Sequence, residues 1–167
     1  MLNAPHIAQD NGNVPTLLGE IMTSAVECVH ADAPLNAAAA RMKERGIRHL
    51  VVVDSFRKPV GVFSERDMLG HIARTLSRGY NVPSRTPIGE LMTAPPKVIT
   101  LTTSIAETAA LMAEHKFGCL PVVNRERELV GIVTVGDLLN VLAGKKQAKS
   151  SARPQAVSVA DANLTED

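Results

Sequence analysis

Aromatic side chains make up only 2% of this 167-residue sequence, and none of them is a Trp. Stacking platforms for single-stranded nucleic acid need exposed rings among basic residues, so they have almost nothing to be built from here. An excess of charge of one sign is also lacking, because 18 Lys and Arg stand against 17 Asp and Glu. No overall field draws the protein toward nucleic acid or anionic lipid. We therefore expect neither a nucleic-acid partner nor a membrane partner.

Long apolar runs and closely spaced cysteines are missing as well. No stretch approaches the roughly 18 apolar residues of a membrane span, and the segment 1–15 lacks the basic start and apolar run of a signal peptide. Cys28 and Cys119 stand 91 positions apart with no C-x-x-C, so no zinc or other metal site is expected. These absences favour a cytoplasmic protein with two reduced thiols, with a redox or interchain role as the alternative.

An internal repeat organises the sequence. When the chain is aligned with itself at an offset of 70 residues, 18–73 matches 88–143 without a gap, and 17 of the 56 positions are identical. Gapless agreement of this kind predicts two copies of one fold unit. We place the copies at 16–73 and 87–143, a linker rich in Gly, Pro and Ser at 74–86, and disordered segments at 1–15 and 144–167.

Both copies predict the same order of elements. A short helix opens each copy, with Thr16 and Thr86 placed to cap it. A brief extended piece, a longer helix with an apolar core stripe, two continuous apolar strands and a last helix follow, which gives the order β-α-β-β-α. Gly46 is expected to end the first long helix, and Ser104 with Glu107 has the spacing of a capping box at the start of the second. The fold class is therefore mixed α/β (α+β), with the two small copies packed on one another because neither buries enough surface alone.

A hydroxyl residue followed three positions later by Asp marks the start of each last helix, as Ser64 with Asp67 and as Thr134 with Asp137. Free backbone amides and the helix dipole favour an anionic or hydroxyl-rich ligand there, and an ionised Asp accepts hydrogen bonds from sugar hydroxyls. The same spacing is also a capping arrangement that needs no ligand. A glycine in each preceding strand, Gly61 or Gly131, fits either a close ligand or strand packing. The residues alone leave both alternatives open.

The doubled pattern resembles a pair of cystathionine-beta-synthase-type (CBS) domains, also called a Bateman module. The segments that carry the resemblance are MTSAVECV, RHLVVVD and GVFSERDML in the first copy and MTAPPKVI, GCLPVVN and GIVTVGDLL in the second, within about 125 matching residues. The resemblance implies two copies related by a pseudo-two-fold axis and no catalytic cofactor. It also implies a regulatory ligand in the cleft between the copies, either AMP, ADP, ATP or S-adenosylmethionine, and a homodimer.

The resemblance further implies two half-sites, each built from both copies. One combines Thr134 and Asp137 with Cys28, Val29, His30, Arg48 and His49, and the other combines Ser64 and Asp67 with Val98, Ile99, Thr100, Gly118 and Cys119. Only the first set includes basic side chains, so we expect phosphorylated ligands to prefer it. His49 has an alternative as a half-buried strand histidine bonded to backbone. Arg66 either reaches a phosphate or lies on a solvated helix face, paired to Glu65 or Asp67.

Catalysis finds little support in the sequence. No G-x-S-x-G, P-loop, G-x-G-x-x-G turn or metal-binding box is present. Two interpretations remain, and neither is an enzyme. The first is a sensor of an adenosyl ligand that signals to an unidentified effector protein. The second is a dimerising interaction module with no nucleotide bound.

Overall fold

The computed structural model describes residues 17–145. The segment 1–15 and all but the first two residues of 144–167, for which we expect disorder, lie outside the described residues. Thr16, expected to cap the first helix, lies outside them too.

The elements follow the predicted order in both copies. The first copy contains η1 (Leu18–Glu20), β1 (Cys28–Val29), α1 (Leu35–Arg45), β2 (His49–Val53), β3 (Pro59–Ser64) and α2 (Glu65–Ser77). The second contains η2 (Ile88–Glu90), β4 (Ile99–Thr100), α3 (Ile105–His115), β5 (Cys119–Val123), β6 (Leu129–Thr134) and α4 (Val135–Leu142). The mixed α/β fold class is therefore confirmed. The opening helices are single 3₁₀ turns.

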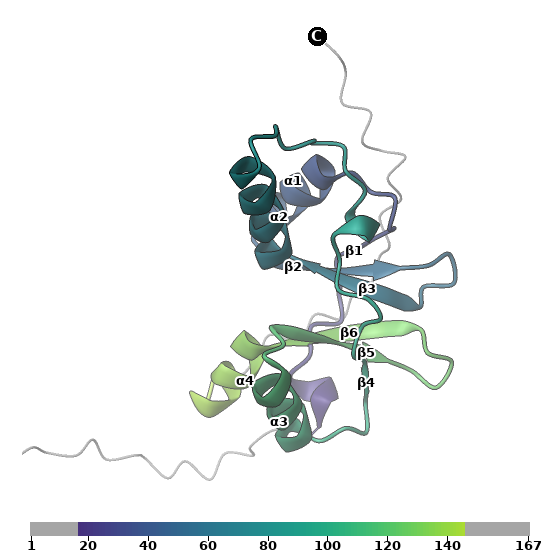
Figure 1. Ribbon diagram of the computed structural model, residues 1–167. Helices are drawn as coiled ribbons and strands as arrows, with labels where there is room; N and C mark the ends of the chain where they lie inside the picture. The colour runs from purple at the N-terminus through teal and green to yellow at the C-terminus, as the bar shows by residue number, and fades with distance from the viewer. Residues whose placement is uncertain (1–16, 146–167) are drawn as a thin grey trace, which may run out of the picture.

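Each copy forms a small sheet of three strands. The order is β1-β2-β3 in one sheet and β4-β5-β6 in the other, with the first pair of strands parallel and the second antiparallel. The two sheets face each other in the middle of the molecule, with α1 and α2 outside one and α3 and α4 outside the other (Figure 1). Strands β2 and β5 are buried along almost their whole length because both faces of each sheet are covered.

Alternate side chains of the strands enter different cores. Cys28, Val51 and Val53 of the first sheet meet Cys119 and Ile132 of the second in a core between the sheets. The intervening side chains point instead toward the helices, because successive residues of a strand face opposite sides. Each sheet thus has a helix-facing core of its own in addition to the shared one.

The opening helices are exchanged between the copies. Leu18 and Ile21, at the start of the first copy, are fully buried in the helix-facing core of the second sheet. Ile88 of η2 is fully buried in the corresponding core of the first sheet. Two isolated bridges fix these positions, Thr23 with Ile132 and Val62 with Thr93. Figure 1 accordingly shows the purple η1 beside α3 and the teal η2 beside β1.

The exchange explains the strand glycines. The Met92 side chain lies directly over Gly61, and Met22 lies over Gly131, with no space for a methyl group at either glycine. Of the two explanations that the sequence leaves open, close packing on the strand is therefore the one that operates at both positions.

Helix ends follow the sequence signals with two exceptions. Ser104 accepts a hydrogen bond from the Glu107 amide (3.1 Å), and α1 ends at Gly46 in the left-handed conformation, as predicted. The prediction that Thr86 caps η2 is wrong, because Pro87 holds the N-cap position and the Thr86 hydroxyl donates to the Pro83 carbonyl (3.0 Å). Helix α2 runs on to Ser77, four residues into the segment expected to be linker.

Candidate functional site

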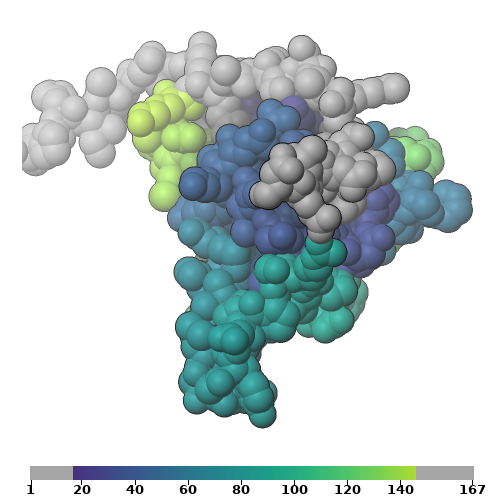
Figure 2. Space-filling model, turned by 90° about the horizontal axis from the view of Figure 1, so that it is seen from above, coloured from purple at the N-terminus to yellow at the C-terminus, as the bar shows by residue number. Residues whose placement is uncertain are grey.

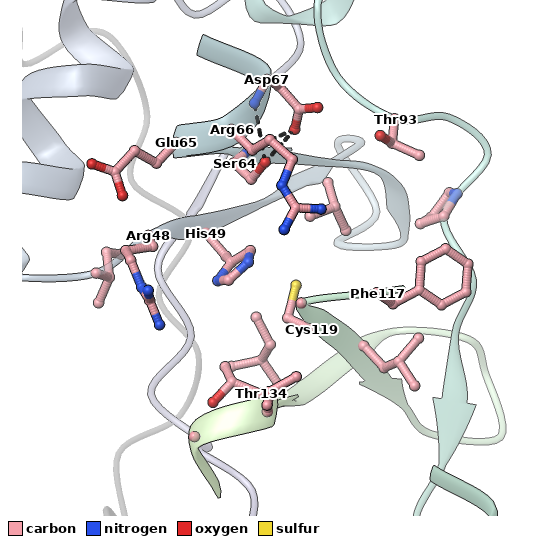
Figure 3. A pocket seen from close by; sticks show the side chains of 18 of the residues that line it. Arg48, His49, Ser64, Glu65, Arg66, Asp67, Thr93, Phe117, Cys119 and Thr134 are labelled. Atoms are coloured by element: carbon pink, nitrogen blue, oxygen red, sulfur yellow. Dashed lines mark hydrogen bonds between the residues drawn. The ribbon is translucent and has the colours of Figure 1, made fainter. Parts of the chain in front are cut away.

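A cavity of about 1060 Å³ opens where the two copies meet (Figure 3). Its wall includes the starts of β2 and β5, the ends of β3 and β6, and the first residues of α2 and α4. The predicted site residues that line it are Arg48, His49, Ser64, Arg66, Asp67, Gly118, Cys119 and Thr134. The structure therefore brings together residues from both copies at one edge of the paired sheets.

Asp67 is the carboxylate that combines capping with exposure to the cavity. The backbone N–H and the hydroxyl of Ser64 both donate to Asp67 Oδ2 (2.8 and 2.6 Å), and the Asp67 amide donates back to the Ser64 hydroxyl (3.3 Å). Within residues 17–145, no hydrogen bond occupies Oδ1. Capping thus uses one carboxylate oxygen of Asp67 and leaves the other able to accept a ligand hydroxyl.

Thr134 and Asp137 form the same capping box in the second copy. The Thr134 amide and hydroxyl donate to Asp137 Oδ2 (2.7 and 2.9 Å). Asp137 is only 7% exposed and does not line the cavity, whereas Thr134 does. The two motifs are equivalent in sequence, but only the carboxylate of the first copy reaches the cavity wall.

Among the described residues, four cationic side chains line the cavity without forming an ion pair. Arg48 and Arg66 come from the first copy, and Lys97 and Lys116 come from the second. None of them takes part in an ion pair with another described residue. Figure 3 shows the Arg66 side chain extending across the cavity toward Cys119. These charges give the cavity a preference for anions.

The nearby carboxylates do not cancel this preference. Glu27 also lines the cavity, but its oxygens are paired with Arg41 (2.8 Å) and Arg45 (3.1 Å). Glu65 and Asp67 are the remaining carboxylates among the described lining residues. The unpaired cations therefore outnumber the unpaired carboxylates.

The sequence places basic groups only among the residues of the Thr134 half-site. In the structure, the second copy also contributes Lys97 and Lys116 to the cavity wall. The alignment contained the signal for both residues. Lys97 stands 70 positions after Glu27, and Lys116 stands 70 positions after Gly46. The ligand contacts predicted from the sequence come only from the strands, the starts of α2 and α4, and the residues just before β2 and β5, and these include neither lysine.

His49 lies at the centre of the cavity, between the two copies (Figure 3). Its ring packs on Gly118, where a methyl group would come within 2.6 Å of Nε2. No described residue forms a hydrogen bond with the ring, so the alternative of a backbone-bonded strand histidine does not apply to it. Burial, followed by the charge of Arg48, lowers the pKa of His49 below its usual 6.5. The ring therefore enters the cavity as a neutral group with free polar atoms.

The repeated unit of this chain matches a known family. The family model of the CBS domain matches residues 18–74 and again 88–144. The chain belongs to the CBS domain family. Hypoxic response protein 1 of Mycobacterium tuberculosis is 32% identical over 123 residues, which are 74% of this chain and 82% of that protein. Several other curated relatives are longer, and the chain spans half of their length or less.

Solved structures of CBS pairs share this arrangement. CBSX2 in complex with AMP has a TM-score of 0.66 at 28% identity, over 78% of this chain and 98% of that one. The CBS domain pair of MJ0100 in complex with 5′-methylthioadenosine and S-adenosyl-L-methionine has a TM-score of 0.66 at 26% identity, over 76% and 99% of the two chains. Related pairs thus bind small adenosyl ligands.

The other predicted contacts of this CBS pair lie away from the cavity wall. Cys28 belongs to the core between the sheets, and Val29 and Ile99 belong to the helix-facing cores. His30 Nδ1 is hydrogen-bonded to the Val53 carbonyl (3.1 Å), and the Thr100 hydroxyl is bonded to the Thr102 hydroxyl (2.9 Å). Val98 does not line the cavity either. The wall uses instead the residues just before the short strands, which are Ala25, Val26, Glu27, Pro96 and Lys97.

Cys28 and Cys119 of this CBS pair are buried thiols that form no disulfide with each other. Burial raises the pKa of Cys28 to about 11 and that of Cys119 to about 12, although Cys119 lies in the cavity wall. A protonated buried thiol is a poor nucleophile, so neither cysteine provides an activated group. Within residues 17–145, no group of three or more His, Cys, Asp or Glu is placed to hold a metal ion. No helix in the same range has the length and apolar character to cross a bilayer.

Proposed function

We propose that this CBS pair is a cytoplasmic regulatory module that binds an anionic adenosyl ligand in the cavity and passes the occupied state to an effector protein. The proposal rests on one observation, namely that unpaired cations surround a cavity whose wall includes Asp67, a helix-start carboxylate with Oδ1 not hydrogen-bonded to any described residue. A ligand with both sugar hydroxyls and a phosphate matches this combination of an acceptor and cations. The AMP and S-adenosylmethionine complexes of related pairs support the adenosyl class.

We assign the ligand sugar to Ser64 and Asp67 rather than to Thr134 and Asp137. Asp67 is half-buried and lines the cavity, whereas Asp137 is buried behind the wall. The anionic group of the ligand would lie toward Arg48, Arg66 and Lys116. This assignment differs from the sequence-based expectation, in which the half-site with Thr134 and Asp137 is the preferred one for phosphorylated ligands.

Calorimetric titration with AMP, ATP, NADH and S-adenosylmethionine tests the proposal, and Asp67→Asn tests the assignment. A hydrogen bond to a charged group contributes about 1.5 to 3 kcal/mol, so we expect Asp67→Asn to weaken binding roughly ten- to hundredfold. Asp137→Asn is the matched control, since it alters the same capping box outside the cavity. If Asp137→Asn weakens binding and Asp67→Asn does not, the assignment is wrong.

A second candidate function is a dimerising interaction module. The outer helices carry exposed leucines, namely Leu69 and Leu76 on α2 and Leu139 and Leu142 on α4. In Figure 2, a teal part of the chain projects from the body of the molecule. A second copy of this chain would cover such apolar side chains, and a homodimer is compatible with either function.

Thermal unfolding with and without ligand distinguishes the two functions. A ligand at 100 times its dissociation constant adds about 2.7 kcal/mol to the stability of the folded protein. If the protein sediments as a dimer in analytical ultracentrifugation and its melting temperature does not change with any of the four compounds, the interaction module is favoured.

A further inference from the structure

The contact between His49 and Gly118 makes the two copies of the repeat unequal. Arg48 and His49 occupy the positions that Gly118 and Cys119 occupy in the second copy. Because residue 118 is Gly, the imidazole of the first copy extends onto the backbone of the second copy. The second copy has Cys119 at the position equivalent to His49, so it places no imidazole in return. Among the described residues, the wall of this pseudo-symmetric cavity therefore includes one histidine, at the junction of its two halves.

Charged groups from the first copy face this ring on two sides. Arg48 precedes it on the chain, and Glu65, Arg66 and Asp67 face it from the start of α2. Lys116 lines the same cavity from the end of α3, whereas Val135 and Gly136 at the start of α4 are uncharged. The ring makes no hydrogen bond with a described residue. In the empty cavity, burial and the neighbouring arginines therefore keep the imidazole neutral.

A bound anion reverses this balance of charges. A phosphate beside Arg48 and Arg66 offsets their positive charges and offers an oxygen to the ring nitrogens. We propose that His49 takes up a proton from solvent when a phosphorylated ligand binds, and that the resulting imidazolium donates a hydrogen bond to the phosphate. His49 is then a specificity-determining residue that makes the preference for phosphorylated over uncharged adenosyl ligands depend on pH. This inference rests on the proposed function.

The direction of the pH dependence follows from linkage. The pKa of His49 is lowered in the free protein, and the bound phosphate raises it. Between these two values the complex holds one more proton than the free protein, so affinity falls as pH rises, by at most about tenfold per pH unit. Adenosine has the same base and sugar but no phosphate, and its affinity should not depend on His49 in this way.

The experiment is a titration of wild type and His49→Gln with AMP and with adenosine, at about pH 6 and pH 8, in buffers of different ionisation enthalpy. A phosphomonoester itself titrates near pH 6, so the His49→Gln variant, which keeps that titration, is the reference. We expect wild type to take up more protons per AMP than the variant, up to about one. We expect adenosine to show no such difference between the two proteins.

A second measurement uses wild type alone and does not depend on the fold of the variant. In an NMR titration, the pKa of His49 should rise when AMP is added, while His30 and His115, which do not line the cavity, serve as internal controls. Equal proton uptake in both proteins, or an unchanged His49 pKa at saturation with AMP, would overturn the inference and leave the proposed function standing. Absence of binding by AMP at either pH would overturn the inference, and absence of binding by ATP, NADH and S-adenosylmethionine as well would overturn the proposed function.

Discussion

Met92 of the second copy lies over Gly61 of the first, so closely that a methyl group at position 61 would overlap the Met92 sulfur. Met22 has the same relationship to Gly131. We predict that Gly61→Ala and Gly131→Ala each lower the free energy of unfolding by about 1 to 3 kcal/mol, as overpacking of a filled core does. Urea denaturation followed by circular dichroism measures this change. Gly19→Ala, which meets no atom within 4 Å, is the control and should have little effect.

The packing of His49 on Gly118 gives a second prediction. A methyl group at position 118 would come within 2.6 Å of His49 Nε2, so Gly118→Ala should displace the ring and destabilise the protein. His49→Ala combined with Gly118→Ala should cost less than the sum of the two single changes, because the clash is then removed. Gly136 lines the same cavity, and a methyl group there would make only an ordinary contact, 3.4 Å from the Thr134 hydroxyl, so Gly136→Ala is the control. Equal losses from Gly118→Ala and Gly136→Ala would contradict the described contact.

Lys116 gives a prediction of increased stability. It ends α3 with φ 57°, in the left-handed conformation that Gly46 adopts at the end of α1. A non-glycine residue pays about 1 kcal/mol for this conformation, so Lys116→Gly should raise the free energy of unfolding by up to that amount. Glu114→Gly, an exposed substitution inside the same helix, should instead lower it. Thermal melts of the ligand-free variants decide the sign.

Glu107 gives a prediction about pH. The Ser104 backbone amide and hydroxyl donate to its carboxylate (2.9 and 2.8 Å) and hold its pKa below the usual 4.5. Because the folded pKa is the lower one, the stabilisation is fully present above pH 4.5 and is lost as pH falls through the folded pKa. Glu107→Ala should therefore be clearly less stable than wild type at neutral pH, and the difference should shrink as pH falls below 4.5. A difference that stays constant over this range would show that the hydrogen bonds do not depend on the charge.

The order of elements could be predicted because local signals and the repeat agreed. Ser64, Ser104 and Thr134 each cap the helix that their spacing indicates. Thr86 does not, because the following Pro87 has an extended conformation (ψ 134°) and becomes the cap position itself. A pattern of residue types shows where a helix begins, whereas the cap position depends on backbone geometry.

The exchange of η1 and η2 could not be predicted from the sequence. A short apolar segment such as Leu18–Glu20 has the same periodicity whichever sheet it packs against. The identity between Met22 and Met92 is likewise compatible with packing inside a copy or across copies. Which core each segment completes depends on distances that the residue pattern does not contain.

The candidate site could be predicted in part. The hydroxyl and Asp motifs indicated the helix starts that bound the cavity, but two identical capping boxes give no sign that Asp137 is buried and Asp67 is not. The predicted contacts from β1 and β4 lie away from the wall, because those residues fill the cores. Lys97, one position before the predicted Val98, lines the cavity instead.

The exchange also bears on the order in which the protein can be completed as it is synthesised. Everything that builds the first sheet and its outer core lies in one contiguous stretch, from β1 to Met92. The helix-facing core of the second sheet is completed by Leu18 and Ile21, which precede the first sheet in the sequence. The earliest described residues to leave the ribosome are therefore among the last to find their partners, after the rest of the described chain has been made.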